Sequence, residues 1–95
     1  MLTQEKNKQK TISIIDGNAA LMLYNDDVNT FDHVILSLIE VCGLTFEKAV
    51  ERTFFVHYNG MGVVKKGKLN IMQQMKKGLQ ERGLKAEVID NLEKN

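Results

Sequence analysis

Three polar residues in succession, Asn25, Asp26 and Asp27, stand between an apolar segment and the start of an apolar helical pattern. Neighbouring carboxylates can cap a helix, bind a cation, act as acid and base, or receive a positively charged group from another molecule. Their most common use is a turn in which they accept hydrogen bonds from nearby backbone amides. The three residues by themselves leave these uses open.

His57 is a second residue that could do chemistry, because imidazole can accept or donate hydrogen bonds or ligate a metal. It falls on the apolar stripe of a predicted helix, with Thr53 and Val56 close by. A histidine in that position is most often a packing residue at the edge of a core. Its neighbours nevertheless allow a patch with an apolar floor and a polar rim.

The segment GVVKKGKL is similar to a phosphate-binding loop, since Gly62, Gly67 and Lys68 match the pattern G-x-x-x-x-G-K. Leu69 stands where that loop needs the Ser or Thr hydroxyl that ligates magnesium. The chain is also too short for the parallel sheet that normally carries the loop. We therefore do not expect nucleotide hydrolysis.

The side chains that could ligate a metal lack the spacing of zinc or calcium sites: His33, His57, Asp26, Asp27 and Cys42. Cys42 is the only cysteine, so no disulfide can form within the chain. It lies on the apolar stripe of a predicted helix, where a thiol behaves as a small hydrophobic group. We expect no metal, no cofactor and no catalytic nucleophile.

The composition is that of one small soluble domain. The chain has 95 residues, a formal net charge of +1 and 43% hydrophobic residues. It shows no apolar signal segment and no run of about 18 apolar residues, so we expect a cytoplasmic protein. The charge gives no general attraction to nucleic acids or anionic membranes. One basic stretch remains, formed by Lys65, Lys66, Lys68, Lys76 and Lys77.

The first two elements that must position these groups can be read from the apolar spacing. The segment AALMLY, residues 19–24, predicts a strand that leads directly into the three polar residues. An apolar stripe of helical period covers residues 31–42 and stops at Gly43. Asn29 or Thr30 can cap the free amides at the start of this helix.

The rest of the chain is predicted to form two more helices and two more strands. A second helix is predicted from its cap at Thr45 to Gly60, and its later part becomes polar on the apolar face. Residues 61–66 read as a strand, residues 68–83 as a third helix, and residues 84–89 alternate as a half-buried edge strand does.

The order β-α-α-β-α-β predicts an α+β fold: a small three-stranded antiparallel sheet with three helices on one face. Residues 1–10 are polar and without periodicity, so they have too little apolar surface to offset the entropy of ordering them. We expect residues 1–18 to be a flexible N-terminal extension, in which residues 11–15 can form a short strand. Residues 19–95 are expected to form the single domain.

Two segments together resemble the ClpS family, the adaptors that deliver substrates with destabilising N-terminal residues to Clp unfoldases. They are NDDVNTFDHV at residues 25–34 and AVERTFFVHYNG at residues 49–60. Each half is a weak motif, and the combination is specific. The resemblance covers residues 20 to 90, and the order of strands and helices agrees with the fold of that family.

The resemblance implies a role for each matching position. Asn25, Asp26 and His57 match the residues that hold the free α-amino group of the substrate. Asp27 matches an aspartate that serves the turn, and Thr30 is assigned to the turn and cap. The apolar pocket for the first side chain is implied to be lined by Phe31, Val34, Thr53 and Val56.

Some positions depart from the family pattern. A proline and a methionine are common where this chain has Thr30 and Phe31, and the methionine gates the pocket; a methionine is also common in place of Thr53. We interpret the larger Phe31 and smaller Thr53 as a paired exchange that reshapes the pocket and keeps its volume.

The surface for the unfoldase also departs from the pattern. The positions that align with charged docking residues of the third helix are uncharged here: Asn70, Gln73 and Met75. Docking is therefore expected to use the lysines of the basic stretch.

The sequence thus predicts a binding protein and no enzyme. Its expected partners are the N-terminal domain of a Clp unfoldase, of the ClpA or ClpC type, and proteins that begin with Leu, Phe, Tyr or Trp. Two alternatives stay open at this point: a basic module that binds nucleic acid or the ribosome, and a regulator that docks on the unfoldase without binding N-termini.

Overall fold

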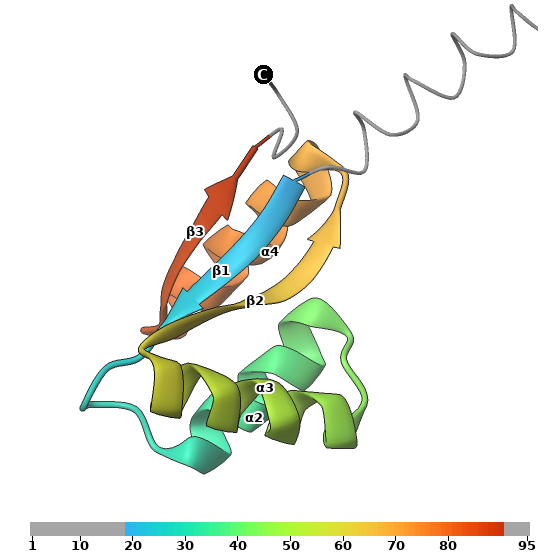
Figure 1. Ribbon diagram of the computed structural model, residues 1–95. Helices are drawn as coiled ribbons and strands as arrows, with labels where there is room; N and C mark the ends of the chain where they lie inside the picture. The colour runs from blue at the N-terminus through green and yellow to red at the C-terminus, as the bar shows by residue number, and fades with distance from the viewer. Residues whose placement is uncertain (1–18, 91–95) are drawn as a thin grey trace, which may run out of the picture.

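The computed structural model describes residues 19–90. They form one β-sheet with the helices packed on one of its faces (Figure 1). The elements in chain order are β1 (Ala19–Tyr24), α2 (Phe31–Cys42), α3 (Phe46–Asn59), β2 (Met61–Gly67), α4 (Leu69–Glu81) and β3 (Lys85–Ile89). This is the predicted order β-α-α-β-α-β. The predicted N-terminal extension, with its short strand at residues 11–15, lies outside the described residues.

The sheet is antiparallel, and its strand order is β2-β1-β3. β1 is therefore the central strand, and its last residue, Tyr24, pairs with Met61 of β2 on one side and with Lys85 of β3 on the other. The pairing of β1 with β2 shifts register between Leu21 and Met22. Because of this central placement, β1 exchanges backbone hydrogen bonds with a neighbour on both sides.

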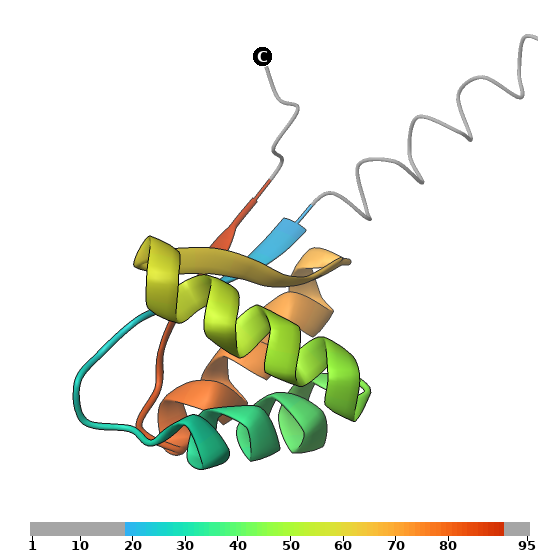
Figure 2. The ribbon, with the colours of Figure 1, turned by 60° about the horizontal axis from the view of Figure 1, so that its bottom comes forward.

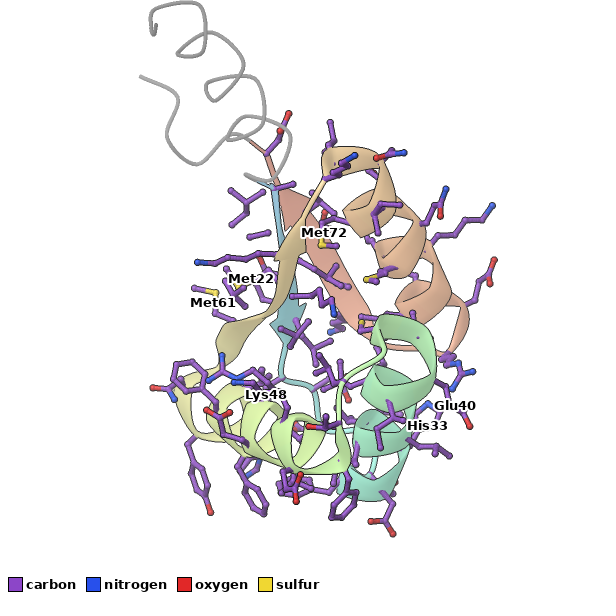
Figure 3. All side chains as sticks on the ribbon, turned by 90° about the vertical axis from the view of Figure 1, so that its right-hand side faces the viewer. Met22, His33, Glu40, Lys48, Met61 and Met72 are labelled. Carbon is purple, nitrogen blue, oxygen red and sulfur yellow. The ribbon has the colours of Figure 1, made fainter. Side chains whose placement is uncertain are left out.

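The helices cover one face of the sheet (Figure 2). α4 packs on β1 and β3, α3 packs on β2, and α2 packs against α3 and α4. The core lies between the sheet and the helices, and its largest fully buried apolar side chains are Leu21, Leu23, Leu38, Met72 and Leu79. Figure 3 shows Met22 and Met61 on the side of the sheet that faces away from α4. The predicted α+β fold is confirmed.

Local sequence signals explain where the two helices next to the site begin and end. The hydroxyl of Thr30 accepts a hydrogen bond from the His33 N–H, and Thr45 does the same for Lys48. At the other ends stand Gly43 and Gly60, with φ of 70° and 90°. Such positive φ values favour glycine, because a Cβ would collide with the backbone. The predicted bounds of α2 and α3 are confirmed.

The later elements differ from the prediction by one or two residues. β2 continues to Gly67, and α4 ends at Glu81, with Arg82 as its cap. The predicted end of the helix, Gly83, has a φ of 85° and forms the turn into β3. Within residues 19–90, no helix is long and apolar enough to cross a membrane.

Candidate functional site

One backbone hydrogen bond joins the two halves of the sequence motif. The N–H of Asn25 donates to the carbonyl oxygen of Gly60 at 2.9 Å. Since Tyr24 pairs with Met61, the residues that follow β1 lie beside the residues that precede β2. The segment after β1 therefore lies next to the end of α3, where His57 stands.

A pocket of about 240 Å³ lies at this junction. Its volume is below the roughly 300 Å³ of the smallest sites for drug-sized ligands, so it suits one side chain. Eight of the nine residues predicted for the amine site, the pocket and the adjacent turn line it, and the ninth, the cap Thr30, lies outside it. The lining is Leu23, Tyr24, Asn25, Asp26, Asp27, Asn29, Phe31, Val34, Thr53, Val56, His57 and Leu84.

The pocket has an apolar floor and a polar rim. Leu23, Val56 and Leu84 are buried, with 1%, 4% and 4% of their surface exposed. Asn25 and His57 are exposed at the opening. A ligand with an apolar side chain and a polar head would therefore bury its side chain in the floor and place its head among the hydrogen-bonding groups of the rim.

Phe31 forms an aromatic wall of the pocket. Its ring meets the ring of Phe54 edge to face, with centroids 4.9 Å apart, and it meets His57 in the same way, also at 4.9 Å. Edge-to-face contacts of this kind contribute about 0.5–1.5 kcal/mol beyond the buried area. Because both contacting residues belong to α3, this helix restricts the rotation of the Phe31 side chain.

The carboxylate of Asp26 is engaged inside its own loop. One oxygen accepts hydrogen bonds from the backbone N–H groups of Val28 and Asn29, at 2.8 and 2.9 Å. The other oxygen accepts from the side-chain amide of Asn29 at 3.0 Å. Three of the roughly four lone-pair sites of a carboxylate are therefore occupied.

These hydrogen bonds also set the acidity of Asp26. Burial by itself would raise the pKa of the carboxyl, but the hydrogen bonds from Asn29 and Val28, together with the charge of Lys85, hold the pKa below its usual value of 3.8. Asp27, next in the chain, is exposed, and no hydrogen bond of its side chain is found within residues 19–90. The two carboxylates therefore differ in their free acceptor capacity.

Asn29 ties this loop to the turn between α4 and β3, which lies far along the sequence. Its side-chain amide donates to Asp26 and also to the carbonyl oxygen of Gly83, at 3.0 Å each. His33 adds a second tie, since its Nε2 donates to the Arg82 carbonyl oxygen at 2.8 Å. The turn from α4 to β3 is thereby fixed against the start of α2. This arrangement brings Leu84 into the pocket.

The sequence did not identify Asn29 or Leu84 as site residues. Asn29 was considered only as a helix cap, a role that Thr30 fills. A capping-type residue close to Asp26 could have pointed to the hydrogen bond between their side chains, because Asn and Asp often pair in turns. For Leu84 no local signal exists, because only the tertiary packing of β3 beside β1 places it there.

The predicted docking lysines lie away from the pocket. Lys65 and Lys66 are on β2, Lys68 caps α4, and Lys76 and Lys77 are in α4. The ion pairs of the described residues involve other groups: Lys48 and Arg52 with Glu51, and Arg82 with Glu40.

The remaining candidates for chemistry are placed as follows. Cys42 is buried, and burial raises the pKa of its thiol to about 11 despite the opposing charge of Lys65. Among residues 19–90, no three side chains of His, Cys, Asp or Glu are grouped in a way that could hold a metal ion.

Three comparisons bear on this chain. The family model described as ATP-dependent Clp protease adaptor protein ClpS matches residues 16–87. The ATP-dependent Clp protease adapter protein ClpS of Nostoc sp. (strain PCC 7120) is 36% identical over 64 residues, which are 66% of this chain and 65% of the relative. The alignment thus spans slightly less than two thirds of the relative.

A solved structure is also similar. It is that of Agrobacterium tumefaciens ClpS2 bound to L-phenylalaninamide, with a TM-score of 0.69 and 21% identity. The match covers 78% of this chain and 96% of that chain. At this identity the likeness establishes a shared fold.

Proposed function

The chain belongs to the ClpS family of Clp protease adaptors, and on this premise we propose that it binds the free N-terminus of proteins that begin with a bulky apolar residue. It then delivers them to a Clp unfoldase for degradation. In this role the protein binds and hands over its substrate, and it makes or breaks no covalent bond.

The observation that carries the proposal is the combination of an apolar pocket with a rim of acceptors. A protonated N-terminal amine has three N–H donors, and an amide oxygen, a carboxylate and a neutral imidazole nitrogen can each accept one. Asn25, Asp27 and His57 offer these three groups at the opening of the pocket. The apolar floor below them suits the side chain of the same residue.

We assign the carboxylate contact to Asp27, which changes the role predicted from the sequence. The prediction gave that contact to Asp26 and a structural role to Asp27. Support for the exchange comes from the three hydrogen bonds that Asp26 already accepts from Val28 and Asn29. Asp26 then holds the loop in shape, and Asp27 faces the amine.

The two contacts together produce selectivity. A charge-assisted hydrogen bond contributes about 1.5–3 kcal/mol, and burial of a Leu or Phe side chain contributes about 1.5–3 kcal/mol. Each amounts to about 10- to 100-fold in affinity. An internal Phe has no free amine and lacks the charge-assisted hydrogen bonds, and an N-terminal Ala lacks most of the buried apolar surface. Both are therefore expected to bind much more weakly than an N-terminal Phe.

The ligand of the similar solved structure is consistent with this chemistry. L-phenylalaninamide, bound there to ClpS2 of Agrobacterium tumefaciens, carries a free α-amino group and a phenyl side chain. We expect this chain to bind proteins beginning with Leu, Phe, Tyr or Trp.

Delivery requires a second surface for the unfoldase. We propose the exposed lysines of β2 and α4 for this contact, since they lie outside the pocket and leave it free for substrate. Replacing Lys66, Lys68 and Lys77 by Ser is expected to weaken binding to the N-terminal domain of a Clp unfoldase and to leave peptide binding unchanged.

The experiment that tests the proposal is a binding series with three peptides of one length, beginning Phe-Gly, Ala-Gly and Gly-Phe. Fluorescence anisotropy should show tight binding for Phe-Gly only, and the other two should bind at least about tenfold more weakly. Comparable affinity for Gly-Phe and Phe-Gly would show that the site reads any exposed Phe, and the proposal would be wrong.

A further inference from the structure

Two aromatic side chains lie exposed to solvent beside the pocket. Phe54 and Tyr58, which we call the outer ring pair, stand four residues apart on α3, and their rings stack with centroids 6.1 Å apart. Phe54 is 40% exposed and Tyr58 is 76% exposed. Neither residue lines the pocket. Aromatic surface that is exposed and gathered in one place commonly marks a site where another molecule binds.

The outer ring pair is continuous with the pocket. The ring of Phe54 meets the ring of Phe31 with centroids 4.9 Å apart, and the ring of Tyr58 meets that of His57 at 5.0 Å. Phe31 and His57 both line the pocket, and their rings also touch each other. The four rings therefore form one surface that begins at the opening of the pocket and continues over α3.

This continuity favours the substrate as the occupant of the outer ring pair. A second copy of the chain, or the unfoldase, seated on these two rings would also meet Phe31 and His57 and would obstruct the opening. A substrate whose first side chain fills the pocket has to leave across the rim in any case. If it leaves over α3, it covers the exposed faces of two aromatic rings.

The geometry of an extended peptide assigns one of its residues to this surface. Successive side chains of an extended chain point to opposite faces, so the first and third residues face the protein and the second points away. Two residues of extended chain span about 6.4–6.8 Å. Each ring of the outer ring pair lies one ring contact, 4.9 or 5.0 Å, beyond a ring that lines the pocket. The third side chain is therefore the one within reach.

We infer that the outer ring pair is a second subsite, which takes the third residue of the substrate and prefers a large apolar side chain there. The inference rests on the proposed function and narrows its substrate class to N-termini with bulky apolar residues at the first and third positions. Such a side chain removes the exposed faces of Phe54 and Tyr58 from water, whereas Gly or Ser leaves them hydrated.

The test compares three peptides on the full chain: Phe-Gly-Phe-Ser, Phe-Phe-Gly-Ser and Phe-Gly-Gly-Ser. The first two have the same composition and differ only in the position of the second Phe. Calorimetry should show that Phe-Gly-Phe-Ser binds about fivefold more tightly than each of the others, which corresponds to about 1 kcal/mol. Equal affinity for Phe-Gly-Phe-Ser and Phe-Gly-Gly-Ser, or an equal gain for Phe-Phe-Gly-Ser, would overturn the inference.

Tyr58→Ser removes one ring of the pair at an exposed position. The ratio of the dissociation constants of Phe-Gly-Gly-Ser and Phe-Gly-Phe-Ser should then fall from about fivefold to about twofold or less. Tyr58→Phe keeps the ring and should keep the ratio. A ratio that stays at its wild-type value in Tyr58→Ser would overturn the inference.

Phe46→Ser is the matched control. Phe46 is another exposed aromatic residue of α3, but it stands at the first position of the helix, about 18 Å from Tyr58 along the axis, and does not line the pocket. Its replacement should leave the ratio unchanged. A loss as large as that of Tyr58→Ser would show a general effect of removing surface aromatic groups and would contradict a subsite at the outer ring pair.

An acetylated peptide separates this inference from the proposed function. All three free peptides begin with Phe, so equal affinities among them overturn the subsite and leave recognition of the N-terminus intact. If acetyl-Phe-Gly-Phe-Ser binds as well as the free peptide, the proposed function itself fails. The comparison of the three peptides on the unmodified chain stands even if a variant does not fold.

Discussion

Replacing each of the two adjacent aspartates by asparagine should have different consequences. Asp27→Asn removes the carboxylate that we assign to the substrate amine, and the loop keeps its hydrogen bonds. Asp26→Asn keeps an oxygen for the N–H groups of Val28 and Asn29, but it places an NH₂ group against the side-chain amide of Asn29. The first change should therefore affect binding, and the second should affect stability as well.

The magnitudes follow from the hydrogen bonds. Asp27→Asn turns a charge-assisted contact into a neutral one, which should cost about 1.5 kcal/mol and weaken peptide binding about tenfold. Asp26→Asn loses one charge-assisted bond inside the fold, so the free energy of unfolding should fall by about 1.5 kcal/mol. For a domain of this size, that lowers the Tm by about 6–12 °C.

The assay measures the Tm and the affinity for a Phe-Gly peptide for both variants. Asp27→Asn should have an unchanged Tm and weakened binding, and Asp26→Asn should have a lowered Tm. Asp27→Ser provides a control without an amide and should match Asp27→Asn. The reasoning is refuted if Asp26→Asn unfolds at the wild-type temperature and loses binding, while Asp27→Asn binds normally.

Three further predictions concern acid, the aromatic wall and the buried thiol. The pKa of Asp26 is below its usual 3.8 in the fold, so its contribution to stability is complete above that value and is lost as the pH falls through the lower folded-state pKa. The difference in unfolding free energy between wild type and Asp26→Asn should therefore shrink as the pH falls below 3.8 and through the lowered pKa of the folded state, and a constant difference would contradict this. Phe31→Met removes the edge-to-face contacts with Phe54 and His57, so the order of affinities for Leu-, Phe-, Tyr- and Trp-initiated peptides should change; an unchanged order would refute the paired exchange with Thr53. Cys42, buried and with its pKa raised to about 11, should react with a disulfide reagent near pH 8 far more slowly in the native chain than in denaturant, and equal rates would place it at the surface.

Much of the fold could be predicted because its signals are local. The apolar stripe from Phe31 to Cys42, closed by Gly43, needs no knowledge of the rest of the chain to be read as a helix. The apolar run Ala19–Tyr24 predicts a strand by itself, and it is the central strand of the sheet. The end of α4 was predicted two residues too late, at Gly83, because Arg82 and Gly83 belong to the turn that leads into β3.

The site was harder to predict because it depends on contacts between distant segments. The motif resemblance pointed to the residues that line the pocket, and it gave the amine contact to Asp26, whereas we propose Asp27. Our proposal depends on the side chain of Asn29, which donates to Asp26 and also to the carbonyl of Gly83, 54 residues away in the sequence.

The central claim is that the site recognises a free α-amino group together with the first side chain. The most direct measurement compares two peptides that differ only by N-terminal acetylation, Phe-Gly and acetyl-Phe-Gly. Acetylation removes the positive charge and two donors and leaves the phenyl ring unchanged. The account predicts that the acetylated peptide binds at least about 100-fold more weakly, because Asn25, Asp27 and His57 lose their common partner. Equal affinity for the two peptides would contradict it.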